Sequence, residues 1–383
     1  MKNRPYSQFC FLAMFVFGLT LVSCTEDEPA PEQLAVPDTY EFVRNQQSTV
    51  DYSGQAARLD MLSAIKSYLV LADGGQEISA DQLNDMYANA NDPFEDATLN
   101  ASGKQLEDKT FAPHISNFKD MFEQMAAISS DVAVNQTQAA AGQAGLLERG
   151  NTGNTILVNE KGWEYTQFIE KGLMGSVFFH QIFNVYLSAD RMGSEVNNSD
   201  LVDDKNYTLK EHYFDEAFGY WGVPTDFPSE LPSSHRRFWA SYTYGRNAAT
   251  QSLGKLKSAF LIGRTAIVNN DQATLDQSIT IILEELEMVA VATAIHYLND
   301  ASENYNAADI GNMFHHLSEA YVFMQSLRVH PSSQIPAEDL TELLDNGFGV
   351  DQDFWTVTPA DIEALKTSLI TYYPTLASIA DQL

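Results

Sequence analysis

Apolar residues recur along most of the chain at intervals of three and four positions. This spacing places them on one face of an α-helix, whereas the two-residue alternation that is typical of a half-buried strand is scarce. Leu59, Leu62, Ile65 and Leu69 form one such stripe. The pattern predicts an all-α fold, and no run of residues is expected to form a central strand.

Capping residues and prolines divide this pattern into separate helices. Ser79-x-x-Gln82 and Thr208-x-x-Glu211 have the spacing of a capping box, and proline favours the first helical turn. Helices are expected over residues 54–71, 79–89, 160–189, 209–221, 236–253, 255–268, 272–300 and 307–329, with others after Pro113, Pro336 and Thr358.

The best internal boundary is the stretch 225–235, which contains Pro228 and Pro232. We therefore expect residues 51–230 to form a first helical bundle and residues 231–383 to form a second.

The N-terminus has the pattern of a secretory signal. A basic start is followed by the uncharged run Phe9–Val22, which is shorter than a membrane span. The run ends in Leu21-Val22-Ser23-Cys24, which resembles the lipobox of bacterial lipoproteins. The resemblance implies that residues 1–23 are removed and that Cys24 is acylated. The alternative is an ordinary cleaved signal that leaves Cys24 as a free thiol.

Residues 24–50 are expected to be a flexible acidic tether. Thr25-Glu-Asp-Glu28 follows Cys24 directly, and three prolines come within the next nine positions. An acidic run in this place resembles the surface-export signal of Bacteroidota lipoproteins, although a solvated linker would have the same composition. We expect an outer-membrane lipoprotein that faces either the cell surface or the periplasm.

The charge and the cysteine content exclude several classes of protein. With 22 Lys and Arg against 52 Asp and Glu, the chain has a net charge of −30. Nucleic acids and anionic membrane surfaces both require clustered cations, so neither is an expected electrostatic partner. The two cysteines form no C-x-x-C pair, which excludes a zinc finger or a disulfide scaffold. No catalytic-serine elbow, His-Glu-x-x-His motif or glycine-rich phosphate loop is present.

Two segments share one pattern. Residues 212–220 and residues 315–323 both read His-x-x-x-Glu-Ala-aromatic-x-aromatic, and each follows a long apolar helix that ends in Tyr-Leu. The repetition indicates a degenerate internal duplication. Coincidence among common helix residues is the alternative.

These two segments contain the candidate metal ligands. Side chains three or four positions apart share one helix face, so His212 can share an ion with Asp215 or Glu216. In the same way, Glu319 can share an ion with His315 or His316. Imidazole and carboxylate together suit a divalent or ferric ion, and we expect the two turns to face each other across one pocket. A simple salt bridge on each helix is the alternative.

Other charged residues have a structural interpretation. Arg236, Arg237 and Arg264 are expected to pair with acidic residues across the bundle.

The sequence resembles a Bacteroidota lipoprotein family catalogued as domain of unknown function 4856. The resemblance rests on Lys171-Gly-Leu-Met-Gly175, on the segment from Glu211 to Pro224, and on His316-x-x-Glu319-Ala320. That family is similar to the imelysin-like proteins, which are helical, extracytoplasmic and linked to iron uptake. The His-x-x-acid part of the imelysin motif is present in both turns, but Lys210 and Phe314 stand where that motif has glycine.

The leading hypothesis is a lipid-anchored, imelysin-like protein that binds a metal ion, with iron as one candidate, or a metal-bearing ligand for uptake. Its partners would be the membrane, through Cys24, and components of an uptake system. The alternative is a surface lipoprotein that binds a glycan or peptide by stacking it on the aromatic helix 213–221. A metallopeptidase is a weaker third option.

Overall fold

The apolar stripes of the sequence form the buried faces of the helices. The computed structural model describes residues 33–228 and 231–383. In α1 (Ser53–Asp73), the predicted stripe from Leu59 to Leu69 is buried in the core. Helices dominate the described residues, with only two small strand pairs, so the all-α prediction is confirmed.

The predicted helices are present with small changes at their ends. The remaining α-helices are α2 (Ala80–Ala88), α3 (Ala97–Asn100), α4 (Ile115–Asn135), α5 (Tyr165–Leu173), α6 (Ala189–Met192), α7 (Leu209–Trp221), α8 (Trp239–Thr250), α9 (Ser252–Val268), α10 (Gln272–Asn306), α11 (Ile310–Gln325), α12 (Ala337–Asn346) and α13 (Pro359–Tyr372). The capping box predicted at Thr208 and Glu211 is present at the start of α7, and the Ser79 side chain caps α2.

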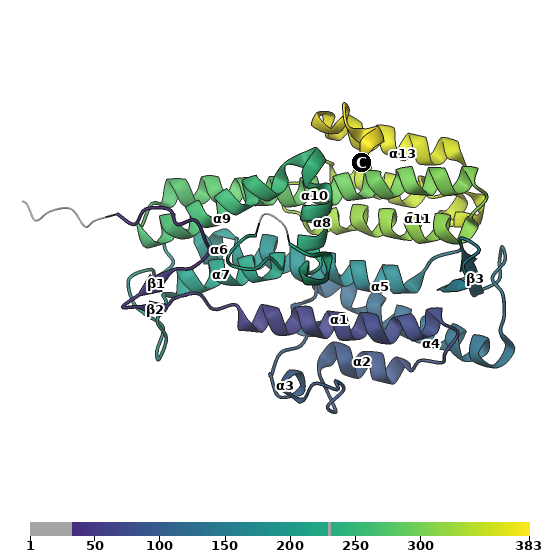
Figure 1. Ribbon diagram of the computed structural model, residues 1–383, viewed down its shortest axis with the longest axis horizontal. Coiled ribbons are helices and arrows are strands. Elements are labelled where there is room, and N and C mark those ends of the chain that lie inside the picture. The colour runs from purple at the N-terminus through teal and green to yellow at the C-terminus, as the bar shows by residue number, and fades with distance from the viewer. Residues whose placement is uncertain (1–32, 229–230) are drawn as a thin grey trace, which may run out of the picture. The chain divides into compact units, whose positions relative to one another are not determined.

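The helix predicted over residues 160–189 is a central element of the fold. It consists of α5 followed by two stretches of wider π-helical turns, η3 (Met174–Phe179) and η4 (Gln181–Tyr186). Every residue of α5 and η3 is buried. α5 packs against α1 on one side and α11 on the other, and α7 packs between α1 and α9 (Figure 1). The helices therefore form layers, with α5 and α7 in the middle.

Two hairpins were not predicted. β1 (Val43–Arg44) pairs with β2 (Gln47–Ser48), and β3 (Gly145–Arg149) pairs with β4 (Asn154–Val158), both antiparallel. The second hairpin lies beside α11, and Gly311 at the start of α11 packs directly on the main chain of Glu148. A Cβ atom at residue 311 would clash there, so this glycine lets α11 approach the hairpin closely.

Residues Leu34–Leu383 form one compact unit. Contacts between α7 and α9, and between α5 and α11, cross the boundary expected at 225–235. The division of this unit into two bundles stays a prediction. Among the described residues, no helix combines the length and apolarity that a membrane crossing needs.

Candidate metal centre

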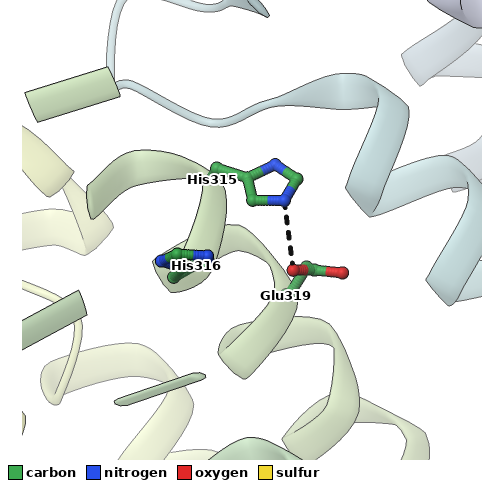
Figure 2. A group of neighbouring side chains, drawn as sticks. All are labelled: His315, His316 and Glu319. Atoms are coloured by element: carbon green, nitrogen blue, oxygen red, sulfur yellow. Dashed lines mark ion pairs between the residues drawn. The ribbon is translucent and has the colours of Figure 1, made fainter. Parts of the chain in front are cut away.

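Three potential metal ligands meet on two successive turns of α11. The side chain of Asp309 caps the helix by accepting a hydrogen bond from the N–H of Asn312. His315, His316 and Glu319 follow, and one potential ligand atom from each lies within 4.8 Å of the other two. Figure 2 shows the His315 ring directed toward Glu319, with His316 beside them. The sequence predicted His316 and Glu319 as ligands and named His315 as an alternative partner.

A buried carboxylate orients His315. Nδ1 of His315 lies 2.7 Å from Oε2 of Glu164, and Nε2 lies 3.3 Å from Oε2 of Glu319. Gln167 donates a hydrogen bond of 2.9 Å to the other oxygen of Glu164, and the Glu164 N–H donates to the Ser318 hydroxyl. Glu164 is therefore fixed at the start of α5, and the ring it holds presents Nε2 to Glu319.

The two carboxylates also determine the protonation of His315. Burial lowers the pKa of the imidazole, but the charge of Glu164, followed by that of Glu319, raises it above the ordinary value. Burial raises the pKa of the Glu164 carboxyl, but the charge of His315 has the larger combined effect with its hydrogen bond, so the pKa of Glu164 lies below its ordinary value. Without a metal, the two carboxylates therefore favour the imidazolium form of His315, which carries a proton on Nε2 as well as on Nδ1. An ion bound at Nε2 would replace that proton and leave the Nδ1–H bond to Glu164 intact, which is a common arrangement around metal-binding histidines.

His316 is a neutral donor. Burial, together with the charge of His315, lowers the pKa of His316 to about 3. Its Nδ1 lies 2.9 Å from the side-chain oxygen of Asn304, which can only accept a hydrogen bond, so Nδ1 carries the hydrogen. Nε2 consequently holds a lone pair and needs no deprotonation to bind a metal.

Glu319 also interacts with a buried cation, Lys171. Burial raises the pKa of its carboxyl, although the charges of His315 and Lys171 oppose this effect. Nζ of Lys171 is 3.8 Å from Oε1 of Glu319 and 2.8 Å from Glu170, which in turn lies 2.9 Å from Lys66. The acids and bases form an alternating chain, so the cluster is close to neutral before any metal arrives.

The two imidazoles and the carboxylate indicate which metal ions the site could bind. Imidazole nitrogen suits zinc, copper, iron and nickel, and the combination of two histidines with one carboxylate leaves coordination positions open. The donor set therefore fits a first-row transition-metal ion better than calcium or magnesium, which prefer oxygen ligands.

The family described as "Domain of unknown function (DUF4856)" matches residues 37–374. The chain belongs to this family. No curated protein and no solved structure matches the chain. The relation of this DUF4856 chain to imelysin-like proteins stays a hypothesis that rests on the motifs in the sequence.

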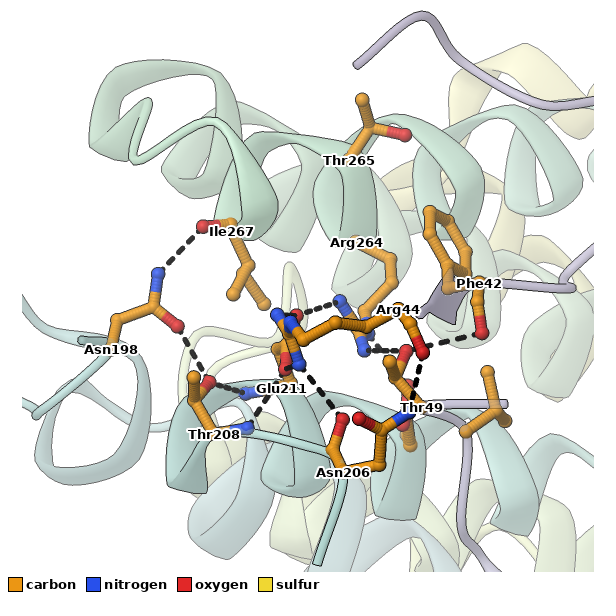
Figure 3. Close-up of polar contacts among 12 residues, drawn as sticks. Phe42, Arg44, Thr49, Asn198, Asn206, Thr208, Glu211, Arg264, Thr265 and Ile267 are labelled. Carbon is orange, nitrogen blue, oxygen red and sulfur yellow. Dashed lines mark hydrogen bonds and ion pairs between the residues drawn. The ribbon is translucent and has the colours of Figure 1, made fainter. Parts of the chain in front are cut away.

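The other predicted ligands lie on α7, in a separate group. In this DUF4856 protein, Oδ1 of Asp215 accepts hydrogen bonds of 2.9 Å from both Arg264 and Tyr40. The neighbouring Glu211 binds Arg44 and Arg264, and Figure 3 shows both guanidinium groups reaching it. Asp215 is therefore part of a buried ion pair, as the sequence suggested for Arg264.

His212 and Glu216 have further partners of their own. His212 stacks on Tyr207 with ring centres 4.5 Å apart, and its Nε2 is 3.9 Å from Glu216. Glu216 accepts hydrogen bonds from Gln55 at 2.9 Å and Tyr186 at 3.1 Å. These partners come from α1, from η4 and from the loop before α7, whereas those of the α11 group come from α5 and α10.

The expected common pocket is not observed. Within the described ranges, no hydrogen bond or ion pair joins the α7 group to the α11 group. Each group instead has an ion pair of its own: Arg264 pairs with Asp215, and His315 pairs with Glu319.

Four aromatic residues of α7 belong to the core. Phe214, Phe218, Tyr220 and Trp221 are all 0% exposed. Trp221 also donates a buried hydrogen bond to Thr243. These four rings therefore provide no surface on which a glycan or peptide could stack. Tyr213, the remaining aromatic residue of the helix, is partly exposed, and the glycan- or peptide-binding alternative stays a prediction. Cys24 and the predicted signal peptide lie outside the described residues.

The sequence reasoning missed Glu164 and the role of Lys171. Glu164 is 151 positions from His315, and no spacing rule connects them. Lys171 belongs to one of the segments that indicated the family, but its pairing with Glu170 and Glu319 depends on the packing of α5 against α11.

Proposed function

We propose that this protein binds a divalent transition-metal ion through His315, His316 and Glu319. The observation that carries the proposal is the orientation of His315 by the buried Glu164, which directs Nε2 toward Glu319 beside a neutral imidazole. Such a carboxylate behind a histidine is a recurrent feature of metal sites. It supports iron or zinc as the ion.

Binding for uptake is favoured over peptide hydrolysis. The side chains of His315, His316 and Glu319 are 14%, 18% and 6% exposed. This degree of burial suits an ion that enters the site better than a polypeptide that must lie across it. Glu164 is occupied by His315 and Gln167, so it is not placed to activate a water molecule.

The proposal includes a lipid anchor. The lipobox-like Leu21-Val-Ser-Cys24 would place the acylated protein at the outer membrane, where it would deliver the ion or a metal-bearing ligand to an uptake system. Mass spectrometry of the N-terminal peptide tests this part, because acylation of Cys24 adds the mass of its fatty-acyl chains. A mature chain that begins at another residue would contradict it.

Cobalt titration tests the metal site. The metal-stripped protein is titrated with Co²⁺, and the visible absorption of the bound ion is recorded. His316→Gln is the most informative variant, because His316 is neutral and its removal leaves no buried charge without a partner. We expect one ion per chain in the wild type and an affinity at least about tenfold weaker in the variant.

His212→Gln is the matched control. His212 has the same His-x-x-x-Glu setting on a helix, but it lies in the α7 group. The control should bind cobalt like the wild type. Equal losses in both variants, with unchanged circular dichroism, would overturn the assignment, and so would a wild type that binds no ion.

A further inference from the structure

A cavity of about 630 Å³ lies beside α1, the α5–η3 segment and the start of α8. Four of its lining residues are cationic, namely Lys66, Lys171, Arg236 and Arg237, and two are acidic, Asp60 and Glu170. The chain as a whole has 52 acidic residues and 22 basic ones. Among the described lining residues, basic side chains therefore outnumber acidic ones, whereas acidic side chains predominate in the chain as a whole.

Two ammonium groups meet at one side of the cavity. Glu170 binds two ammonium groups at once, with Lys66 at 2.9 Å and Lys171 at 2.8 Å. Lys171 also lies 3.8 Å from Glu319, which does not line the cavity, so this ammonium group is shared between two carboxylates.

The rim positions two guanidinium groups. Arg237 pairs with Asp60 at 2.6 Å, and Nε of Arg236 donates a hydrogen bond of 2.6 Å to the carbonyl oxygen of Leu231. The Arg236 guanidinium also lies over the Tyr244 ring, 5.0 Å from its centre. Contacts of this kind hold a guanidinium in one orientation before a ligand arrives, which lowers the entropic cost of binding.

We infer that this cavity binds a small-molecule anion that carries a carboxylate or phosphate group. Its volume is in the range of small-ligand sites. Arginine and lysine form strong, charge-assisted hydrogen bonds with both kinds of oxyanion, and a hollow lined by cations attracts anions from solution. The hydroxyl group of Ser241 also belongs to the lining. Within the described part of the chain, Lys66 and Arg236, the two cations used in the test below, have no ion pair with the proposed metal ligands.

Calorimetric titration of the purified full chain tests the inference. Succinate and inorganic phosphate serve as the anionic probes, and diethyl succinate serves as a neutral probe of related shape. We expect at least one anion to bind at a single site, more weakly as the salt concentration rises, and the neutral ester not to bind. Binding of succinate alone would identify a carboxylate ligand, and binding of phosphate alone would identify a phosphate ligand.

Charge-neutralising variants locate the site. Lys66→Gln and Arg236→Gln should each weaken binding at least about fivefold, as expected for the loss of one charge-assisted contact of about 1 kcal/mol or more. Lys119→Gln is the control, because Lys119 pairs with Glu107 at 2.6 Å and does not line the cavity. Lys66 is 46% exposed, so its variant is expected to fold. If neither anion binds, or if all three variants bind alike, the inference is wrong.

Discussion

The imidazole of His315 and the carboxylate of Glu164 lie 2.7 Å apart, although one belongs to α11 and the other precedes α5. This contact connects the middle layer of the fold to the helix that carries the candidate ligands. It also gives His315 a defined orientation and proton position. The chemistry of the proposed metal centre therefore depends on a residue that does not touch the ion.

Replacement of Glu164 tests this dependence. Glu164→Gln keeps the size of the side chain but removes the charge that holds the Nδ1–H of His315. The expected result is metal affinity about 10- to 100-fold weaker, which is the usual effect of removing such a partner. Competition with a fluorescent chelator measures it. Unchanged affinity in a folded variant would show that the orientation of His315 does not matter.

Metal binding should strengthen as the pH rises. The pKa of His315 lies above its ordinary value of 6.5 because the charges of Glu164 and Glu319 outweigh the effect of burial. A proton on Nε2 competes with the ion, so affinity should rise about tenfold per pH unit below this pKa and level off above it. His316, with a pKa of about 3, contributes nothing in this range.

Affinities measured between pH 5 and pH 9 in non-coordinating buffers provide the check. In Glu164→Gln the His315 pKa should fall, which would move the start of the plateau to lower pH. A profile that is flat in the wild type would contradict the displacement of a His315 proton.

Arg264 should be essential for stability and not for metal binding. Its side chain is 0% exposed and pairs with Glu211 at 3.0 Å and with Asp215 at 2.9 Å. Arg264→Met would leave two buried carboxylates with too few partners, which costs about 3–5 kcal/mol of unfolding free energy. Urea denaturation measures the loss. Arg44→Met is the control, because Arg44 is 31% exposed and Glu211 would retain Arg264, so a smaller loss is expected.

The buried acid Asp73, near Glu164, makes the stability of the protein depend on pH. Burial, followed by the charge of Glu164, raises the pKa of Asp73 to about 8. Asp73 accepts hydrogen bonds from the Leu157 N–H at 2.9 Å and from the Thr166 hydroxyl at 2.8 Å. An asparagine can keep both contacts, with its amide group donating to the Thr166 oxygen.

Asp73→Asn should therefore stabilise the protein increasingly as the pH rises. Between about pH 4 and pH 8 the Asp73 carboxyl is ionised in the unfolded wild type but protonated in the folded protein. The free energy of unfolding of the wild type therefore falls as the pH rises through this range. The variant has no such group. Urea denaturation of both proteins at pH 4, 6 and 8 should show that the advantage of Asp73→Asn grows with pH, and a constant difference would refute the raised pKa.

Local sequence signals predicted much of the fold. The stripe in α1, the cap at Thr208 and the proline at the start of α13 depend on residues a few positions apart, so their effects can be read from the chain directly. The β3–β4 hairpin was missed because its strands are short and its apolar run, Ile156 to Val158, is equally compatible with a helix.

The candidate site was only partly predictable. The spacing of His316 and Glu319 on one helix is local, and the structure brings both residues together with His315 on α11. The partners of the two turns are not local: Arg264 lies 49 residues from Asp215, and Glu164 lies 151 residues from His315. The equal spacing of the two motifs suggested equal roles, but a nearby guanidinium makes Asp215 part of an ion pair.

Anomalous X-ray scattering from crystals grown with zinc or iron would show whether an ion binds on α11. Data collected on both sides of the absorption edge of the metal reveal the ion independently of the protein. We expect one peak about 2.0–2.2 Å from a ring nitrogen of His315, from one of His316 and from a carboxylate oxygen of Glu319. A peak beside His212 and Glu216, or no peak within reach of α11, would contradict this expectation.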